Sequence, residues 1–160
     1  MLSTLWMYFI FYNHFQNKEA LVCEVYDDFD LRYKLAYEEA LRGDTANALR
    51  AFFNHYFSGI ERDRDMEILR TVYSIQIYAE TPHDISQPFR PFHTYVRALI
   101  ELGKERGEIS PGADTDAILM LLTNYMVGME YCWSLHGGAY DIVKEGMAAF
   151  DRMLRGFACE

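Results

Sequence analysis

Basic residues, cysteines and long apolar runs are all scarce in this sequence, and each shortage excludes a class of protein. Lys and Arg number 15 against 24 Asp and Glu, so the 160-residue chain has a formal net charge of −9 and repels a phosphate backbone. Its 3 cysteines, Cys23, Cys132 and Cys159, show no Cys-x-x-Cys spacing. They predict neither a disulfide framework nor a zinc ribbon, and they fit a reducing cytoplasm.

The longest unbroken apolar run extends from Leu5 to Tyr12. It is far shorter than the roughly 18–20 apolar residues that span a bilayer. No Lys or Arg precedes it and no small-residue cleavage site follows it, which excludes a signal peptide. We therefore expect a soluble, cytoplasmic protein without a membrane partner, in which residues 1–11 pack against the body or a partner subunit because exposed apolar residues are unfavourable in water.

Motifs that carry catalysis or bind cofactors are also missing. The sequence has no Gly-rich phosphate loop and no Gly-x-Ser-x-Gly elbow, and its 5 histidines are scattered. Glu80 and His83 are separated by Pro82, while Cys132 and His136 lack a second ligand pair, so neither spacing predicts a metal site. We expect no enzymatic activity, no cofactor and no metal.

Apolar and aromatic residues are plentiful. Hydrophobic residues make up 51% of the chain and aromatic residues 16%, enough for a core without disulfides or metal at this length. No linker-like segment or internal repeat divides the chain, so we expect it to fold as one unit. The aromatic content indicates an aromatic-lined pocket, a large apolar interface, or both.

Apolar residues recur at three- and four-residue spacing from Lys18 onward, which predicts an all-α fold of about six helices. The first expected helix spans Lys18 to Arg42, and the second is capped by Asp44 or Thr45 and carries the apolar stripe Leu49 to Ile60. The third expected helix contains Ile68 to Tyr78, and the fourth contains Phe89 to Ile100. The fifth is opened by Asp114 and Asp116 and ended by Gly137, and the sixth spans Tyr140 to Phe157. The third is apolar on more than one face, which predicts a central position.

A short run before the first long helix carries a family pattern. Tyr12, His14, Phe15, Lys18, Glu19 and Leu21 follow the spacing Tyr-x-His-Phe-x-x-Lys-Glu-x-Leu. This run resembles the one that joins the DNA-recognition helix to the long connecting helix in the TetR family of bacterial transcriptional repressors. The six helices that follow resemble that family's ligand-binding and dimerisation domain in number and order. The resemblance implies that residues 18–160 form a TetR-like C-terminal regulatory domain, and that Tyr12, His14, Phe15, Lys18 and Leu21 form the hinge to a DNA-binding region.

The chain departs from the family pattern before Tyr12. Family members carry two helices and most of a recognition helix there, which form a helix-turn-helix that reads the major groove. Here 11 residues precede Tyr12, and Trp6 to Ile10 include no Lys or Arg to contact phosphate. We expect residues 1–17 to be a remnant of a truncated helix-turn-helix region or an apolar N-terminal segment. DNA is an expected partner only if a missing N-terminal domain is restored.

The family resemblance also implies a ligand cavity inside the regulatory domain. Its expected lining combines apolar surface with a few hydroxyl, amide and indole groups, which suits a small apolar or aromatic effector. The expected lining residues are Phe53, Tyr56, Phe57, Tyr73, Ile77, Phe92, Tyr95, Asn124 and Trp133. A packed core without a ligand would show the same aromatic pattern, and the sequence leaves both interpretations open.

The last two expected helices are apolar on more faces than a monomer can bury, which predicts a homodimer with an interface of two helices per subunit. Small residues there would permit close approach of the helices. The expected interface residues are Leu121, Tyr125, Gly128, Met129, Val143, Gly146, Met147, Phe150 and Leu154.

Two functions follow from these patterns. The first is the regulatory domain of a TetR-like transcriptional regulator, in which an effector binds one conformation of the dimer better than the other and so shifts the population. The alternative is a stand-alone protein without DNA binding, which sequesters a ligand or forms mixed dimers with an intact relative.

Overall fold

The computed structural model describes residues 18–42, 47–63, 66–78 and 90–157, with side chains described for 25–42, 47–61, 66–74 and 90–157. These ranges form six helices and contain no strand. The helices are α2 (Lys18–Arg42), α3 (Ala48–Asp63), α4 (Met66–Tyr78), α5 (Pro91–Glu105), α6 (Thr115–Leu135) and α7 (Ile142–Arg155). The predicted all-α fold of about six helices is confirmed, and the first helix has the predicted limits.

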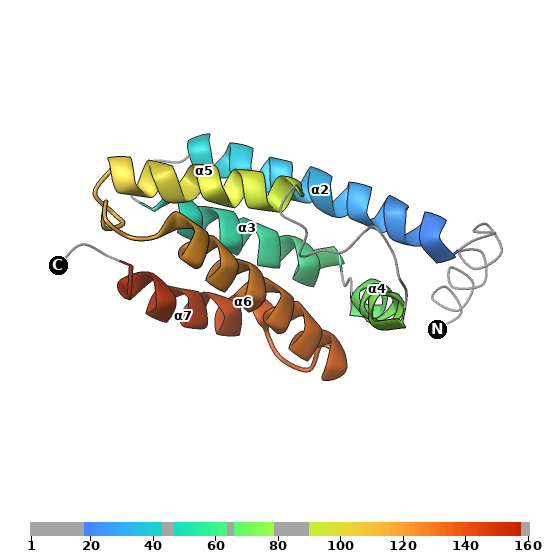
Figure 1. Cartoon of the computed structure of the whole chain (residues 1–160). Coiled ribbons are helices and arrows are strands. Elements are labelled where there is room, and N and C mark those ends of the chain that lie inside the picture. Colours follow the sequence, from blue (N-terminus) through green and yellow to red (C-terminus); the bar gives the residue numbers. More distant parts are fainter. Residues whose placement is uncertain (1–17, 43–46, 64–65, 79–89, 158–160) are drawn as a thin grey trace.

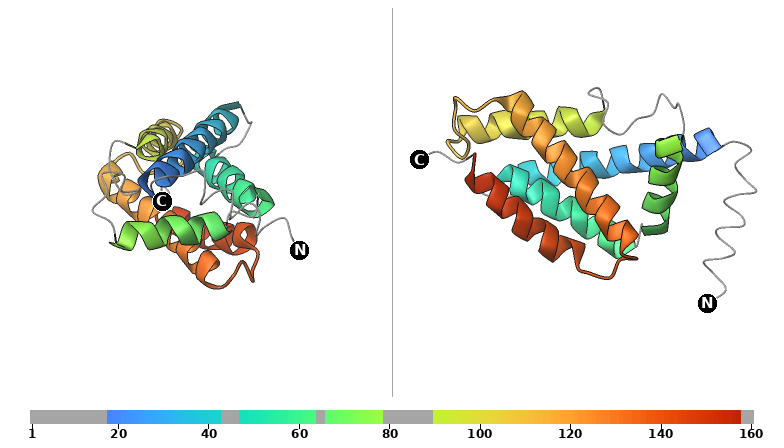
Figure 2. Two further views of the ribbon diagram at one scale, coloured as in Figure 1. Left: turned by 90° about the vertical axis from the view of Figure 1, so that its right-hand side faces the viewer. Right: turned by 60° about the horizontal axis from the view of Figure 1, so that its bottom comes forward.

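Five helices run roughly along the long direction of the molecule, and α4 lies across one end of this bundle (Figures 1 and 2). Helix α3 packs on α2, α5 and α7, while α6 packs on α4, α5 and α7. The predicted central position of the third helix, α4, is therefore wrong. The central helix is α3, because its aromatic stripe meets three helices at once, whereas the apolar faces of α4 pack on α6 and α2.

Local sequence signals account for most helix ends. Asn47 caps α3, since its Oδ1 accepts the backbone N–H of Arg50 at 2.8 Å; the predicted caps Asp44 and Thr45 lie outside the described residues. Asp114 was predicted to open α6 together with Asp116, and it caps the helix by accepting two backbone N–H groups. At the other end of α6, Gly137 adopts φ +66°, a left-handed conformation that favours glycine and ends the helix.

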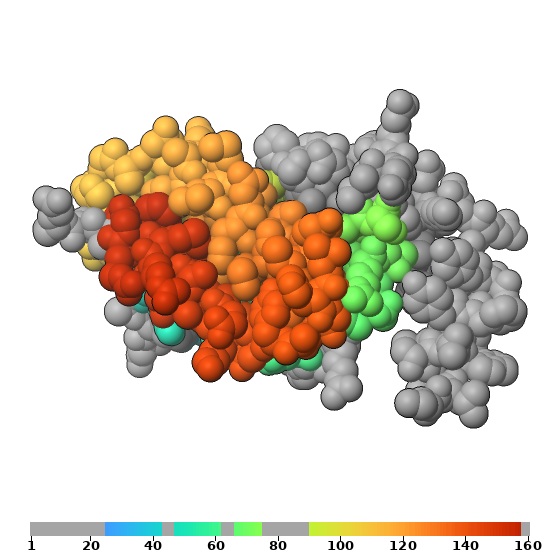
Figure 3. Space-filling model, turned by 90° about the horizontal axis from the view of Figure 1, so that it is seen from below, coloured from blue at the N-terminus to red at the C-terminus, as the bar shows by residue number. Residues whose placement is uncertain are grey.

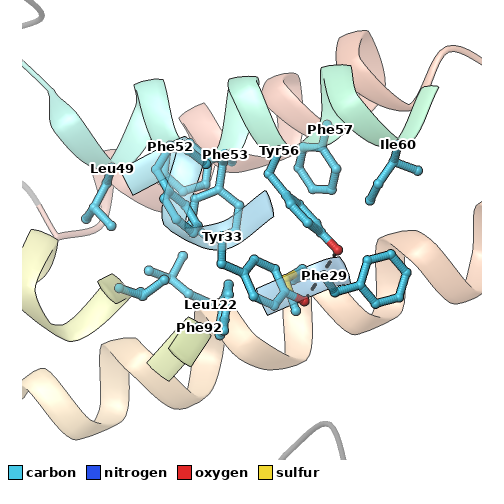
Figure 4. Packing of buried hydrophobic residues seen from close by; sticks show 14 of the residues in the cluster. Phe29, Tyr33, Leu49, Phe52, Phe53, Tyr56, Phe57, Ile60, Phe92 and Leu122 are labelled. Atoms are coloured by element: carbon cyan, nitrogen blue, oxygen red, sulfur yellow. Dashed lines mark hydrogen bonds between the residues drawn. The ribbon is translucent and has the colours of Figure 1, made fainter. Parts of the chain in front are cut away.

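The core is aromatic and centres on α3 (Figure 4). Phe52, Phe53, Tyr56 and Phe57 lie within six residues and are all at most 2% exposed. They pack against rings from other helices, such as Phe150 of α7, whose centroid is 4.7 Å from that of Phe53. Among the helices that the structure describes, none is both long and apolar enough to cross a lipid bilayer.

Candidate functional site

A fully buried carboxylate lies where three helices meet. Glu130 of α6 has a relative exposure of 0%. The hydroxyl of Tyr56, on α3, donates to Glu130 Oε1, and the hydroxyl of Tyr73, on α4, donates to Oε2, both over 2.6 Å. Glu130 therefore joins α3, α4 and α6 through two short side-chain hydrogen bonds.

The periodicity of α6 directs Glu130 inward. Leu122, Met126, Glu130 and Trp133 follow each other at spacings of three or four residues, and all four are buried. A helix places such positions on one face, so the side chain at position 130 must enter the core with its apolar neighbours. Burying a carboxylate there is unfavourable unless polar groups surround it, and the two phenols meet part of that requirement.

Tyr33 extends the cluster to α2. Its hydroxyl oxygen lies 3.4 Å from that of Tyr56, and the two ring centroids are 5.0 Å apart (Figure 4). The ring of Phe92, on α5, packs edge-on against Tyr33 at a centroid distance of 5.2 Å. We call Tyr33, Tyr56, Tyr73 and Glu130 the buried polar cluster.

The three phenols of the buried polar cluster are held in the protonated form. Burial raises the pKa of Tyr33, Tyr56 and Tyr73 above the ordinary value of 10.0, and the negative charge of Glu130 raises each pKa further. At neutral pH these tyrosines are therefore hydrogen-bond donors. A buried carboxylate with phenol donors and aromatic rings around it can orient one polar group of a small molecule.

A second charged group lies at the start of α5. The guanidinium carbon of Arg90 sits 4.2 Å from the ring centroid of Tyr26, and Nη2 donates to Asp30 Oδ1 at 2.6 Å. The pKa of the Asp30 carboxyl is raised by burial, although the charge of Arg90 and its hydrogen bond oppose that shift. This cation–π contact and ion pair fasten α5 to α2. The positive charge of Arg90 also reaches Tyr33, where it acts against the rise in pKa.

The predicted lining residues divide into four groups. Phe53, Tyr56, Phe57, Tyr73, Phe92 and Trp133 are buried. Of these, Tyr56 and Tyr73 contact Glu130, and Phe92 contacts Tyr33. Tyr95 is half-buried and stacks on Tyr37 at 4.8 Å, whereas Asn124 is exposed on the outer side of α6. The side chain of Ile77 lies outside those that the structure describes.

Sequence reasoning missed Glu130, Tyr33 and Arg90. A signal for Glu130 was present, because it is the one acidic or basic residue between Asp116 and Leu135 and falls on the apolar stripe of its helix. Arg90 had no comparable signal. Its position over Tyr26 depends on how α5 packs against α2, which a local pattern does not encode.

The predicted interface residues differ in how far the structure exposes them. Leu121 and Gly128 are exposed on α6, and Tyr125, Met129, Val143 and Leu154 are half-buried. Gly146, Met147 and Phe150 are buried within the chain, because this side of α7 packs on α3. The exposed positions of α7 are mainly charged or small: Lys144, Glu145, Ala148, Arg152 and Arg155. Figure 3 shows α6 and α7 side by side on this face of the molecule, and the large apolar side chains exposed on these two helices belong to α6.

The predicted hinge lies at the edge of what the structure describes. Tyr12, His14 and Phe15 are outside the described residues. Lys18 and Leu21 belong to the first turns of α2, where only the backbone is described. The N-terminal end of α2 lies near α4 (Figure 2), so the chain leading toward residues 1–17 starts at the same end of the bundle as α4.

Comparison with known proteins finds no relative. No family model, no curated protein and no solved structure matches this chain. The TetR resemblance therefore rests on the motif around Tyr12 to Leu21 and on the order of the helices.

Proposed function

We propose that this chain is a ligand-sensing regulatory domain of the TetR type, which binds a small effector at the buried polar cluster and acts as a homodimer. The observation that carries the proposal is that Glu130 is buried in a core made up mainly of apolar side chains. Replacing buried charged groups by apolar ones is often neutral or stabilising. A carboxylate at this position is therefore better explained by recognition than by stability.

The cluster suits an effector with an aromatic body and one hydrogen-bond donor. The aromatic rings of α2, α3 and α5 supply apolar contact, and each oxygen of Glu130 accepts hydrogen bonds. An amine or hydroxyl on the effector would bind this carboxylate in place of a tyrosine hydroxyl. The sequence predicts a small apolar or aromatic effector, and this proposal adds that the effector carries one polar group.

An effector that takes the place of Tyr73 at Glu130 would weaken the attachment of α4 to α6. Hydrogen bonds tie α4 to α6, among them Tyr73 to Glu130 and Arg70 Nε to the carbonyl oxygen of Ser134 at 2.6 Å. An effector that replaces Tyr73 loosens one of them, and α4 lies near the N-terminal end of α2 (Figure 2). Binding would then favour a conformation in which the start of α2 is displaced, which is a population shift that a DNA-binding region attached there would feel.

Thermal denaturation with small aromatic probes tests this proposal. We expect benzylamine and phenol, which carry donors, to raise the melting temperature of the wild-type chain more than toluene or benzoate does. Glu130→Gln should lose most of that ligand-induced rise, measured against its own unliganded melting temperature. Tyr37→Phe is the matched control, because Tyr37 stacks on Tyr95 and, within the described structure, forms no hydrogen bond or ring contact with the buried polar cluster. Equal rises in wild type and Glu130→Gln would contradict the proposal.

A further inference from the structure

The buried polar cluster is enclosed, because all four of its residues are at most 7% exposed. A small molecule therefore reaches Glu130 only after part of the protein moves. Tyr73 is the most exposed of the four, and it belongs to α4, the helix that lies across the end of the bundle (Figure 1). The cluster thus has most solvent contact at Tyr73.

The ring that packs on Tyr73 is that of Tyr131, on α6. The two ring centroids are 5.7 Å apart and the rings are nearly perpendicular, with an interplanar angle of 89°. Tyr131 is 39% exposed. The other rings that contact the cluster in the described structure, those of Phe57 and Phe92, are buried. Among the described residues, Tyr131 is therefore the exposed ring in contact with the cluster.

Tyr131 lies on the flank of α6 that faces α4. Successive residues of a helix are about 100° apart, so Tyr131, which follows the inward-facing Glu130, lies between the buried face and the outer face. Further along α6, the carbonyl oxygen of Ser134 accepts a hydrogen bond from Arg70 of α4. We call the line of contact between Arg70 and Tyr73 on one side and Tyr131 and Ser134 on the other the α4–α6 seam. Figure 3 shows α4 directly beside α6, so this seam reaches the surface of the molecule.

We propose that the effector enters through the α4–α6 seam, and that the ring of Tyr131 is the gate that must turn away from Tyr73 to let it pass. Exposed side chains change rotamer rapidly, whereas buried rings are held by close-packed neighbours. Tyr131 therefore moves without unpacking the core, and its movement uncovers Tyr73, whose hydroxyl donates to Glu130. This inference rests on the proposed function and adds the route to the site and the residue that controls it.

The α4–α6 seam leads to the oxygen at which the effector is proposed to bind. Tyr73 donates to Oε2 of Glu130, and Tyr56, on the central helix α3, donates to Oε1. An effector that arrives beside Tyr73 meets Oε2 first and so displaces Tyr73, which loosens α4, rather than Tyr56. An aromatic amine suits this route, because the faces of the Tyr131 and Tyr73 rings attract a cation on its way to the carboxylate.

Fluorine NMR of para-fluorobenzylamine with the full chain tests the gate, since one titration gives both the dissociation constant and the exchange rate. Tyr131→Ala should raise the association and dissociation rate constants equally, by about tenfold, and leave the dissociation constant within about twofold of wild type, because a gate is crossed on the way in and on the way out. Tyr131→Leu, which leaves a smaller side chain over Tyr73, should raise both rate constants by a smaller factor.

Two variants serve as controls. Tyr131→Phe should keep the wild-type rate constants, since the ring and not the hydroxyl closes the α4–α6 seam. Met120→Ala should also keep them, because Met120 is 64% exposed on the same helix but lies near its other end. Thermal melting verifies that each variant folds.

The outcomes separate the gate from the site behind it. A dissociation constant that rises in Tyr131→Ala with an unchanged association rate constant would make Tyr131 part of the binding surface and overturn the gate. Wild-type rate constants in Tyr131→Ala and Tyr131→Leu would overturn the α4–α6 seam as the route, while the proposed function stands. A wild-type chain that does not bind para-fluorobenzylamine overturns the proposed function and the gate with it.

Discussion

Gly146 of α7 faces the ring of Phe57 of α3 so closely that a methyl group at this position would make contacts shorter than ordinary van der Waals distances. A Cβ at Gly146 would lie 3.1 Å from Cε2 and 3.2 Å from Cδ2 of Phe57, and 3.3 Å from the hydroxyl of Tyr125. That hydroxyl donates to the carbonyl oxygen of Gly146 at 2.5 Å, and Phe57 is fully buried. Gly146 therefore determines how closely α7 packs on α3 within one chain.

Substitution at this glycine should destabilise the fold. We expect Gly146→Ala to lower the free energy of unfolding by about 1 kcal/mol, because overpacking against Phe57 outweighs the helix propensity gained. Urea denaturation measures this change. Ala148→Ser, on the exposed side of the same helix, is the control and should change stability by less than about 0.5 kcal/mol. A stabilised Gly146→Ala chain would show that α7 can move away from α3 at little cost.

Removing either phenol from Glu130 should cost more than removing an exposed hydroxyl. We expect Tyr56→Phe and Tyr73→Phe each to lower the free energy of unfolding by about 1.5–3 kcal/mol, since each leaves a buried carboxylate with one donor fewer. Tyr33→Phe should cost less, because its hydroxyl lies 3.4 Å from that of Tyr56 and does not reach the carboxylate directly. Urea denaturation against a Tyr37→Phe control measures these differences, and equal values for all four variants would contradict the ranking.

The buried phenols should also make the fold sensitive to alkali. The pKa values of Tyr33, Tyr56 and Tyr73 are raised above 10.0, so the folded chain keeps these protons to higher pH than the unfolded chain does. Their contribution is fully present below about pH 10 and is lost as the pH rises further, at about 1.4 kcal/mol per pH unit for each group. Urea denaturation at rising alkaline pH should show this loss. The double variant Tyr56→Phe, Tyr73→Phe should lose stability less steeply, and an unchanged slope would contradict the account.

Arg90 and Arg97 both form ion pairs, but only Arg90 is buried. Replacement by lysine should therefore destabilise the fold more at Arg90 than at Arg97. Arg90→Lys should lower the free energy of unfolding by about 1–3 kcal/mol, because lysine cannot both cover the Tyr26 ring and reach Asp30 in the same way. Arg97→Lys should change it by less than about 0.5 kcal/mol, since the Arg97–Asp116 pair is exposed. Thermal melting of the two variants measures the difference. A larger effect at Arg97 would show that the contact over Tyr26 contributes little.

The sequence predicted the helices well, and the structure explains where prediction failed. Helix α2 has the predicted limits and Asp114 caps α6, because apolar spacing and capping are local signals. The place of α4 at the end of the bundle was missed, since an apolar helix can be covered in the middle of a bundle or across its end. The pattern of α7 likewise does not show whether Phe150 packs on its own chain or on another, and the structure places it against Phe53.

The candidate site was half visible in the sequence. Tyr56 and Tyr73 were among the lining residues that the family resemblance implied, but the carboxylate that they contact was not. Glu130 is separated from Tyr56 by 74 residues, so only the packing of α6 on the rest of the bundle brings them together.

Native mass spectrometry of the purified wild-type chain beside Glu130→Gln is the most direct test of a ligand-binding homodimer. Both the subunit number and any retained small molecule are read from one spectrum. The account predicts a dimer of the 18.8 kDa chain that carries a small-molecule adduct, and a dimer of Glu130→Gln from which that adduct is absent. A bare wild-type monomer, or an adduct that Glu130→Gln retains equally, would contradict it.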